Sequence, residues 1–215
     1  MAKIITVGHL VTSSNDARDR VIKVFEQIAA YSKAHEPGVL TYAVTIPRDD
    51  DGVTIYMLEE YADKATSDAH LTSQPVQDLI NLFTSQPVLK EPPTVYQLEP
   101  VYSFTKPEAM KATDPYIMFA NISYKAGSAT QSLPYWEAVS SESENNEPGS
   151  LQYRLCREEA NADRLHTIEV YESKEYLWEI HAKSKQVKES VEKTKDLRSG
   201  LVHAPLKMVS GFLHR

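Results

Sequence analysis

The sequence has a single cysteine, Cys156, which excludes an intrachain disulfide and a metal cluster built on cysteines. A lone thiol is typical of a reducing compartment. The sequence also lacks an apolar run of about 18 residues, so it predicts no membrane-spanning helix. The apolar run in its N-terminal segment, MAKIITVGHL, is too short for a signal peptide. We therefore expect a complete, cytoplasmic protein.

Basic residues are fewer than acidic residues. The chain has 23 Lys and Arg against 30 Asp and Glu, a formal net charge of −7. Nucleic acids and anionic membranes select basic surfaces, so neither is expected as a partner. The sequence also lacks a glycine-rich phosphate loop, an HExxH motif and a Gly-x-Ser-x-Gly elbow. Their absence excludes the commoner nucleotide-binding, zinc-protease and serine-hydrolase interpretations, and we assign no metal ligand.

The most informative feature that is present is a repeat. The segment EPGVLTYAV begins at Glu36 and EPGSLQYRL begins at Glu147, a separation of 147 − 36 = 111 residues in a chain of 215. With 41% hydrophobic residues, the chain has enough apolar material for one large core or two small ones. A repeat at half the chain length predicts two copies of one unit.

The pattern of the first half predicts the order β-α-β-β-α-β. A β-branched strand comes first, and an amphipathic helix capped by Ser14 or Asn15 follows it. An Asp51-Gly52 turn joins two central strands, and Pro75 restarts the second helical region. The predicted elements are strand 3–11, helix 15–36, strands 39–46 and 53–61, helical region 62–83 and strand 93–102.

The second half repeats this order after a segment without periodicity. That segment, Thr105–Pro115, contains two prolines and is interpreted as a linker. We therefore predict one domain over residues 1–104 and another over 116–215. The predicted elements of the second are strand 116–124, helix 128–146, strands 150–157 and 164–171, helix 173–197 and strand 201–212.

The two copies keep the same parity of apolar residues. Leu40, Tyr42 and Val44 alternate onto one face, as Leu151, Tyr153 and Leu155 do. A β-α-β-β-α-β unit packs both helices on one sheet face and leaves the other face bare. An exposed apolar sheet face is costly in water, so we expect the two halves to cover each other. The fold class is predicted as α+β, with tandem ferredoxin-like units.

These residues resemble the antibiotic biosynthesis monooxygenase domain of the dimeric α/β-barrel superfamily. The resemblance lies in a Pro-Gly turn before a Tyr-bearing strand, a strand ending in Glu and an aromatic, and a helix with His. The positions are Pro37, Gly38, Tyr42, Glu59, Tyr61 and His70, and then Pro148, Gly149, Tyr153, Glu169, Tyr171 and His181. The final spacing is 181 − 171 = 10 residues in the second half, against 70 − 61 = 9 in the first. The resemblance implies sheets that pack as an intramolecular dimeric α/β barrel, a pseudo-dimer within one chain, with a further homodimer left open.

The resemblance also implies a pocket between helices and sheet in each unit, able to take a flat hydrophobic molecule. Some members of the superfamily oxygenate electron-rich phenols or anthrones, as in secondary metabolism, with no metal, flavin or haem. Others degrade haem, using an Asn and a Trp, but Trp178 lies two or three residues early for that pattern. The expected partners are thus a small aromatic substrate and molecular oxygen, and no cofactor is expected.

Oxygenation without a cofactor requires a base, because the substrate must become an electron-rich anion before it reduces oxygen. Histidine is the natural residue type, and the candidates are His70, His9 and His181. Asn121 occupies the position that matches His9 and could bind an oxyanion. The alternatives are a His70 that caps helix carbonyls and polar strand residues that are satisfied by neighbours.

Aromatic residues are the candidates for substrate binding. Trp136 and Trp178 are large and flat, suited to stacking on an aromatic ligand, although core packing is the competing interpretation. The strand tyrosines Tyr42, Tyr61, Tyr153 and Tyr171 are further candidates, with sheet packing as the alternative. Glu59 and Glu169 are expected either to orient a histidine or to pair with a basic residue.

We therefore expect a cofactor-independent monooxygenase acting on an electron-rich aromatic or polyketide-like molecule. One alternative is a non-catalytic ligand-binding or stress-type protein that uses the same cavity. Another is a cyclase or isomerase that folds a reactive intermediate there. Product mass distinguishes oxygenation from cyclisation, because only oxygenation adds oxygen.

Overall fold

A computed structural model describes residues 3–215. The first half of the chain contains the predicted order of elements, with the second helical region divided in two at Ser73. Its elements are β1 (Ile4–Val11), α1 (Asn15–His35), β2 (Val39–Pro47), β3 (Thr54–Tyr61), α2 (Lys64–Thr72), α3 (Gln74–Ser85) and β4 (Thr94–Thr105).

The second half repeats this order after a short 3₁₀ helix, η1, in the predicted linker. The region expected as one long helix begins with a π-helical turn, η2, and then continues through a 3₁₀ turn into α5. The elements are η1 (Pro107–Lys111), β5 (Tyr116–Tyr124), α4 (Ala129–Asn146), β6 (Ser150–Glu158), β7 (Asn161–Tyr171), η2 (Tyr176–Ile180), η3 (His181–Lys183), α5 (Lys185–Thr194), η4 (Lys195–Leu197) and β8 (Arg198–Phe212).

Two long strands are shared between the compact units of the chain. The first unit comprises the residues up to Gln97 together with Leu206–Arg215, and the second comprises Leu98–Pro205. Within the second unit, the later part of β4 pairs antiparallel with β6. Within the first unit, the end of β8 pairs antiparallel with β2. The hydrogen-bonded strand order, β1-β3-β2-β8-β5-β7-β6-β4, is that of a closed barrel, as the fold class predicted.

The unit boundaries differ from the domain boundaries predicted at residues 104 and 116. The difference arises because β4 and β8 each end in a different unit from the one in which they begin. Local composition can only divide the chain into consecutive segments. A compact unit is defined by packing and can combine segments that are far apart in the sequence.

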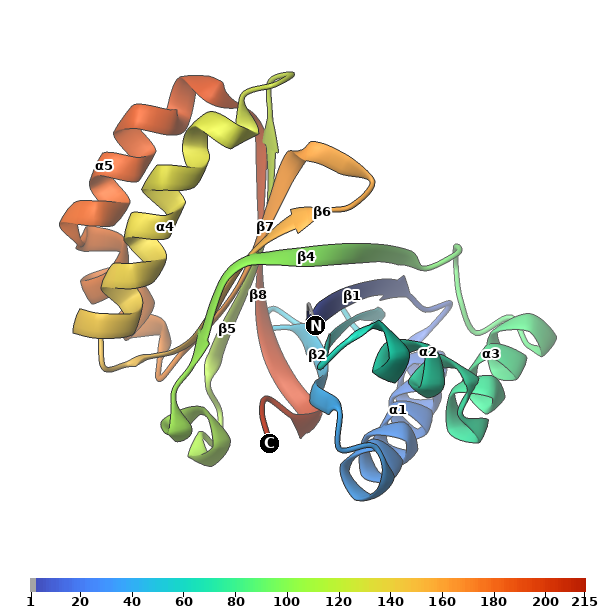
Figure 1. The fold of residues 1–215 in the computed structure, drawn as a ribbon. Coiled ribbons are helices and arrows are strands. Elements are labelled where there is room, and N and C mark those ends of the chain that lie inside the picture. Colours follow the sequence, from blue (N-terminus) through green and yellow to red (C-terminus); the bar gives the residue numbers. More distant parts are fainter. Residues whose placement is uncertain (1–2) are drawn as a thin grey trace. The chain divides into compact units, whose positions relative to one another are not determined.

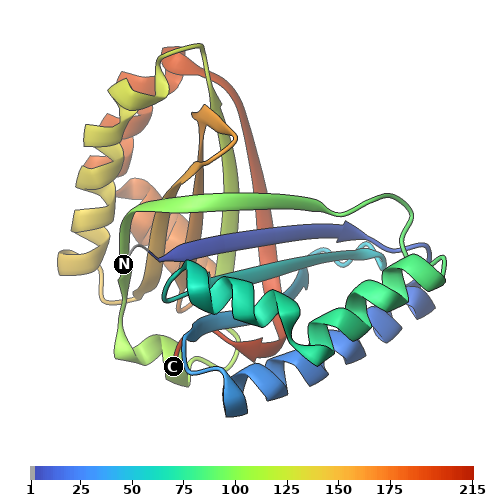
Figure 2. The same ribbon diagram turned by 45° about the vertical axis from the view of Figure 1, so that its right-hand side comes forward.

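Each unit has helices on one face of its strands. In the second unit, α4 and α5 lie side by side against the sheet (Figure 1). In the first unit, α1 and α3 pack together along theirs (Figure 2). The first-unit core joins helix and strand residues such as Val21, Ile28 and Ile55, all fully buried. Helices on one face of a sheet create a space between the two layers, and that space holds the site described below.

Local sequence accounts for where these helices begin. The side chains of Ser14, Asp63 and Ser184 accept hydrogen bonds from the first turns of α1, α2 and α5. Pro75 lies in the first turn of α3, where a missing N–H costs nothing, as predicted. Across residues 3–215, none of the helices combines the length and apolar composition needed to cross a bilayer.

Candidate functional site

A buried histidine–glutamate pair lies at matching positions in the two units. In the first unit, His70 on α2 donates from Nδ1 to Oε2 of Glu36, 2.8 Å away. In the second, His181 donates from Nδ1 to Oε2 of Glu147, also at 2.8 Å. The side chains of His181 and Glu147 are only 7% and 5% exposed, so water screens the pair little. Because Nδ1 is engaged by the glutamate, Nε2 remains for a ligand in each unit.

The neighbours of this pair are also repeated. Ser32 Oγ lies 3.5 Å from His70 Nδ1, and Ser143 Oγ lies 3.3 Å from His181 Nδ1. Both serines are fully buried on the helix that precedes the Glu-Pro-Gly segment. The same residue types at matching positions in both units indicate one constellation built twice.

The π-helical turn explains how the second unit keeps this geometry despite its longer spacing. The backbone N–H of His181 bonds to the carbonyls of both Leu177 and Tyr176, the latter five residues back. A π turn absorbs one extra residue within a helix. The extra residue in the second half is therefore taken up before His181, and His181 meets Glu147 as His70 meets Glu36.

A glutamate–tyrosine pair lies beside each histidine. Tyr61 OH donates to Glu59 Oε2 at 2.6 Å, and Tyr171 OH donates to Glu169 Oε2 at 2.7 Å. The Tyr61 and Tyr171 rings lie 5.4 and 5.1 Å from the His70 and His181 rings between centroids. Tyr42 and Tyr153 flank the same histidines at 5.6 and 6.1 Å. Among residues 3–215, neither Glu59 nor Glu169 forms an ion pair with a Lys or Arg, contrary to one of the two expectations.

Burial and nearby charges shift the pKa values of the tyrosines and of His181. Burial raises the pKa of Tyr42, Tyr153 and Tyr171 well above 10, with nearby glutamates adding to the shift. These phenols therefore stay protonated. Burial lowers the pKa of His181, but the Glu147 hydrogen bond and the charges of Glu169 and Glu147 more than offset it, so the His181 pKa is raised.

The glycine of each Glu-Pro-Gly segment permits close approach of the following helix. A Cβ on Gly149 would lie 2.4 Å from ring atoms of Tyr176, and one on Gly38 would lie 2.6 Å from Thr66 Oγ1. The repeated motif thus has two roles: glutamate binds the histidine, and glycine lets the histidine-bearing helix reach the strand.

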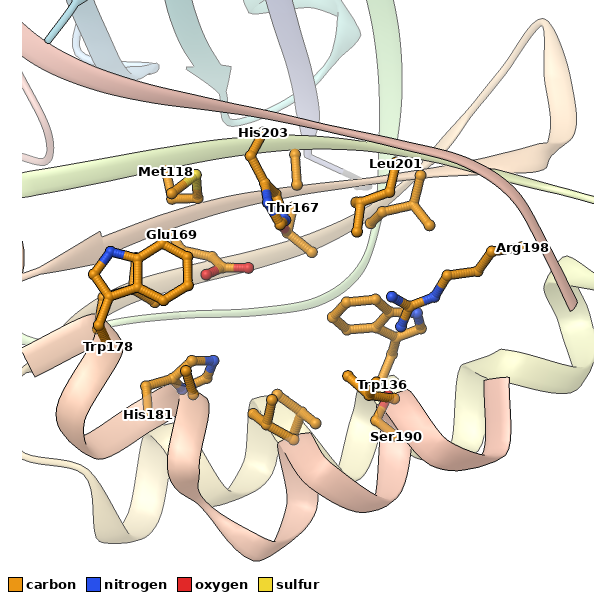
Figure 3. A pocket seen from close by; sticks show the side chains of 17 residues that line it. Met118, Trp136, Thr167, Glu169, Trp178, His181, Ser190, Arg198, Leu201 and His203 are labelled. Atoms are coloured by element: carbon orange, nitrogen blue, oxygen red, sulfur yellow. The ribbon is translucent and has the colours of Figure 1, made fainter. Parts of the chain in front are cut away.

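The His181 side chain lines a cavity of about 260 Å³ in the second unit. Figure 3 shows His181, Glu169 and Trp178 near one end, and Arg198, Trp136 and Ser190 at the other. Aliphatic side chains complete the walls: Ile122, Val139, Leu177, Val187, Val191 and Leu201. Trp178 lines the cavity although it is 41% exposed, so it lies where the cavity meets solvent. A largely apolar space with a few polar groups is typical of a small-molecule site.

The first unit has a corresponding cavity of about 230 Å³. His70, Glu59, Tyr42 and Tyr61 line it, together with apolar residues from β1, α3 and the start of β4. Tyr153 and Tyr171, by contrast, lie behind His181 and do not line the second cavity. Both units therefore offer a histidine at an enclosed apolar surface.

His9 and Asn121 lie away from both cavities. The β1 residues that line the first cavity are Thr6, Gly8 and Leu10, and alternate strand residues point to opposite faces. His9 therefore faces the other side of β1, where its ring lies 4.6 Å from that of Tyr56. Asn121 is likewise flanked by the cavity residues Ala120 and Ile122. The structure does not bring His9 or Asn121 to the candidate site, so their predicted roles lose their geometric basis.

Sequence reasoning named histidines, tyrosines and tryptophans that lie at the site but missed the glutamates that bind the histidines. Glu36 and Glu147 were noted only as helix ends, although their repetition at equal offset was the signal that could have found them. The second cavity also contains polar residues that no motif predicted: Thr167, Ser190, Arg198 and His203. Within residues 3–215, no cluster of three His, Cys, Asp or Glu is arranged to hold a metal ion.

Comparison with known families gives two matches along the chain. The family model described as antibiotic biosynthesis monooxygenase matches residues 4–82 and again residues 115–193. Each match spans one copy of the repeat, including its Glu-Pro-Gly segment and its histidine. No curated protein matches the sequence.

Solved structures share the fold over the whole chain. A candidate monooxygenase from Lactobacillus acidophilus aligns with a TM-score of 0.81 at 19% identity, covering 100% of both chains. One from Fusobacterium nucleatum aligns with a TM-score of 0.85 at 19% identity, covering 100% of this chain and 97% of the other. An anthrone oxidase-like protein aligns with a TM-score of 0.66 at 12% identity, covering 97% and 92%. At these identities the likeness establishes the fold alone.

Proposed function

The chain belongs to the antibiotic biosynthesis monooxygenase family, and within that family we propose that it oxygenates electron-rich aromatic molecules without a cofactor. The observation that carries this proposal is the glutamate-bound histidine at an enclosed apolar cavity, present in both units. A family with several chemistries does not determine the reaction, so the proposal depends on what these residues can do.

The first step is removal of a proton from the substrate. Nε2 of His181 takes a proton from an acidic C–H or O–H of a bound anthrone- or hydroquinone-type molecule. The negative charge of Glu147 stabilises the imidazolium that forms, as the carboxylate does in other carboxylate–histidine pairs. In the first unit, His70 and Glu36 have the same roles.

The substrate anion then reacts with molecular oxygen. It transfers one electron to O₂, and the resulting radical and superoxide combine into a peroxide at the deprotonated carbon. The imidazolium returns its proton to the peroxide, and loss of water from the hydroperoxide leaves a carbonyl group. For an anthrone, the balance is one CH₂ group and one O₂ giving one C=O group and one water. Apolar walls favour these steps by limiting proton transfer from solvent to the carbanion.

The test is oxygen uptake and product mass with anthrone and hydroquinone substrates. We expect the His70→Gln and His181→Gln variants each to retain the activity of the other cavity, and the double variant to lose about 10²–10⁴-fold. With ¹⁸O₂, the product should gain one labelled oxygen atom. The His35→Gln variant is the control, because His35 is exposed on α1.

Failure of the wild-type protein to accelerate oxygen uptake with any of these substrates would refute the proposal. Ligand binding without turnover would favour the non-catalytic alternative. A product with no added oxygen would favour a cyclase or isomerase.

A further inference from the structure

The two cavities differ in polarity at matching positions. Thr167 lies two residues before Glu169, where the first unit has Met57 before Glu59. Ser190 lies nine residues after His181, where the first unit has Leu79 after His70. At these two positions the second cavity therefore has hydroxyl groups and the first has apolar side chains, although Thr6, Ser67 and Gln97 also line the first.

Three polar atoms around the second cavity have no hydrogen-bond partner among residues 3–215. They are Thr167 Oγ1, Ser190 Oγ and Arg198 Nε. Thr167 is fully buried, and Ser190 is 2% exposed. A buried polar group without a partner is destabilising, and native proteins retain few of them. Three such atoms around one cavity indicate a polar ligand.

Arg198 supplies a positive charge at the same place. Its guanidinium lies 5.5 Å from the centre of the Trp136 ring, and Nη2 donates to Thr194 Oγ1 at 3.1 Å. In the described part of the chain, no carboxylate lies within ion-pair distance of it. Stacking on Trp136 holds the guanidinium at the cavity wall, and a guanidinium is suited to bind a carboxylate with two hydrogen bonds.

We propose that the second cavity binds aromatic carboxylic acids, with the carboxylate at Arg198 and at the hydroxyl of Ser190. This inference rests on the proposed function, since the ring of the acid then reaches towards His181. Glu169 and Glu147 lie at the His181 end. Because they repel a carboxylate there, the acid binds in one direction.

Ligand binding without oxygen tests this inference separately from turnover. The two tryptophans of the chain both line the second cavity, so incorporation of 5-fluorotryptophan gives two ¹⁹F resonances that report on that cavity. The probes are 6-hydroxy-2-naphthoate and the neutral 2-naphthol, titrated under nitrogen. We expect wild-type protein to bind the naphthoate at least about tenfold more tightly, because a hydrogen bond to a charged group is the strong kind.

Substitutions at the cavity should weaken binding of the carboxylate probe and leave binding of the neutral probe unchanged. Arg198→Gln should weaken naphthoate binding about 10–100-fold and leave the 2-naphthol affinity within about twofold. Ser190→Ala, which removes the hydroxyl at the Arg198 end, should weaken naphthoate binding about 3–10-fold. The control Arg20→Gln removes the same charge from an exposed position on α1 and should leave both affinities unchanged.

Several outcomes would overturn the inference. Equal affinity of the wild type for the two probes, or equal losses in Arg198→Gln and Arg20→Gln, would remove the carboxylate site while the proposed function stands. Binding of neither probe would overturn the carboxylate site as well as the cavity on which the oxygenase rests. Selective naphthoate binding without oxygen uptake in air would support the site and refute the oxygenase.

Discussion

At the scale of single residues, the glutamate of the Glu-Pro-Gly segment determines what each histidine can do. It engages Nδ1 and so leaves Nε2 for a substrate. Its charge also favours the imidazolium that forms when the histidine accepts a proton.

The rate of oxygenation should depend on pH in a direction set by His181. A general base must be neutral, and the His181 pKa is raised above 6.5. In a His70→Gln background, where the second cavity acts alone, the rate should therefore rise with pH through an inflection above 6.5. Glu147→Gln removes a hydrogen bond and a charge that raise the His181 pKa but leaves the burial that lowers it. The inflection of this variant should therefore lie at lower pH, as initial rates across pH would show.

An inflection that stays in place in Glu147→Gln would mean that another group is the base. Rates that fall with rising pH would have the same meaning.

The family pattern in the sequence marked residues that lie at the cavities, and their roles stay predictions. His70 and His181 lie in the cavities, but the pattern carried no information on their partners across the fold. His9 was misplaced because β1 is buried on both faces: Ile5 and Val7 point one way and Gly8 and Leu10 the other. Without alternation of polar and apolar residues, the face that meets a cavity cannot be read from the sequence.

At the scale of elements, the sequence does not predict the π-helical turn before His181. The extra residue before His181 was evident as a longer spacing. Its conformation was not, because a local propensity does not distinguish a π turn from a shifted helix. The turn is recognised only when the histidine must meet a fixed partner such as Glu147.

The contact between β8 and β2 should depend on a single glycine. Gly211 has φ of +95°, and a Cβ there would lie 1.9 Å from the carbonyl oxygen of Tyr42. Gly211→Ala should therefore destabilise the protein by about 3 kcal/mol or more, from strain and overpacking together. The measurement is urea unfolding followed by circular dichroism.

Gly127→Ala is the matched control. Gly127 also has positive φ, at +74°, but nothing lies within 4 Å of an added Cβ. The expected cost is only about 1 kcal/mol, from backbone strain alone. Equal costs for the two alanine variants would show that the approach of β8 to β2 does not limit stability.

At the scale of the whole molecule, each unit contains strands from both halves of the chain. The repeat predicted two units, and the family model confirmed two matches. The exchange of β4 and β8 was not predicted, because strand partners far apart in sequence leave no local signal. The strands themselves were expected, at 93–102 and 201–212, but both are longer than their apolar patterns indicated.

Cutting the chain between its halves should not release two separate proteins. A protease site inserted between the exposed residues Thr113 and Asp114 would leave β4 on one fragment and its partner β6 on the other. The end of β8 and its partner β2 would be divided in the same way. We expect the cleaved fragments to elute together in size-exclusion chromatography and to separate in concentrated urea. Two folded fragments that elute separately without urea would contradict the observed pairing.

The late position of the last strand also has a consequence during synthesis. Thr41 Oγ1 donates to the carbonyl of Leu213, a residue 172 positions further along the chain. On the ribosome, the edge of β2 that pairs with β8 therefore stays unpaired until β8 has been translated. The unit that is translated first is the one that matures last, and its open edge is where a chaperone is most needed.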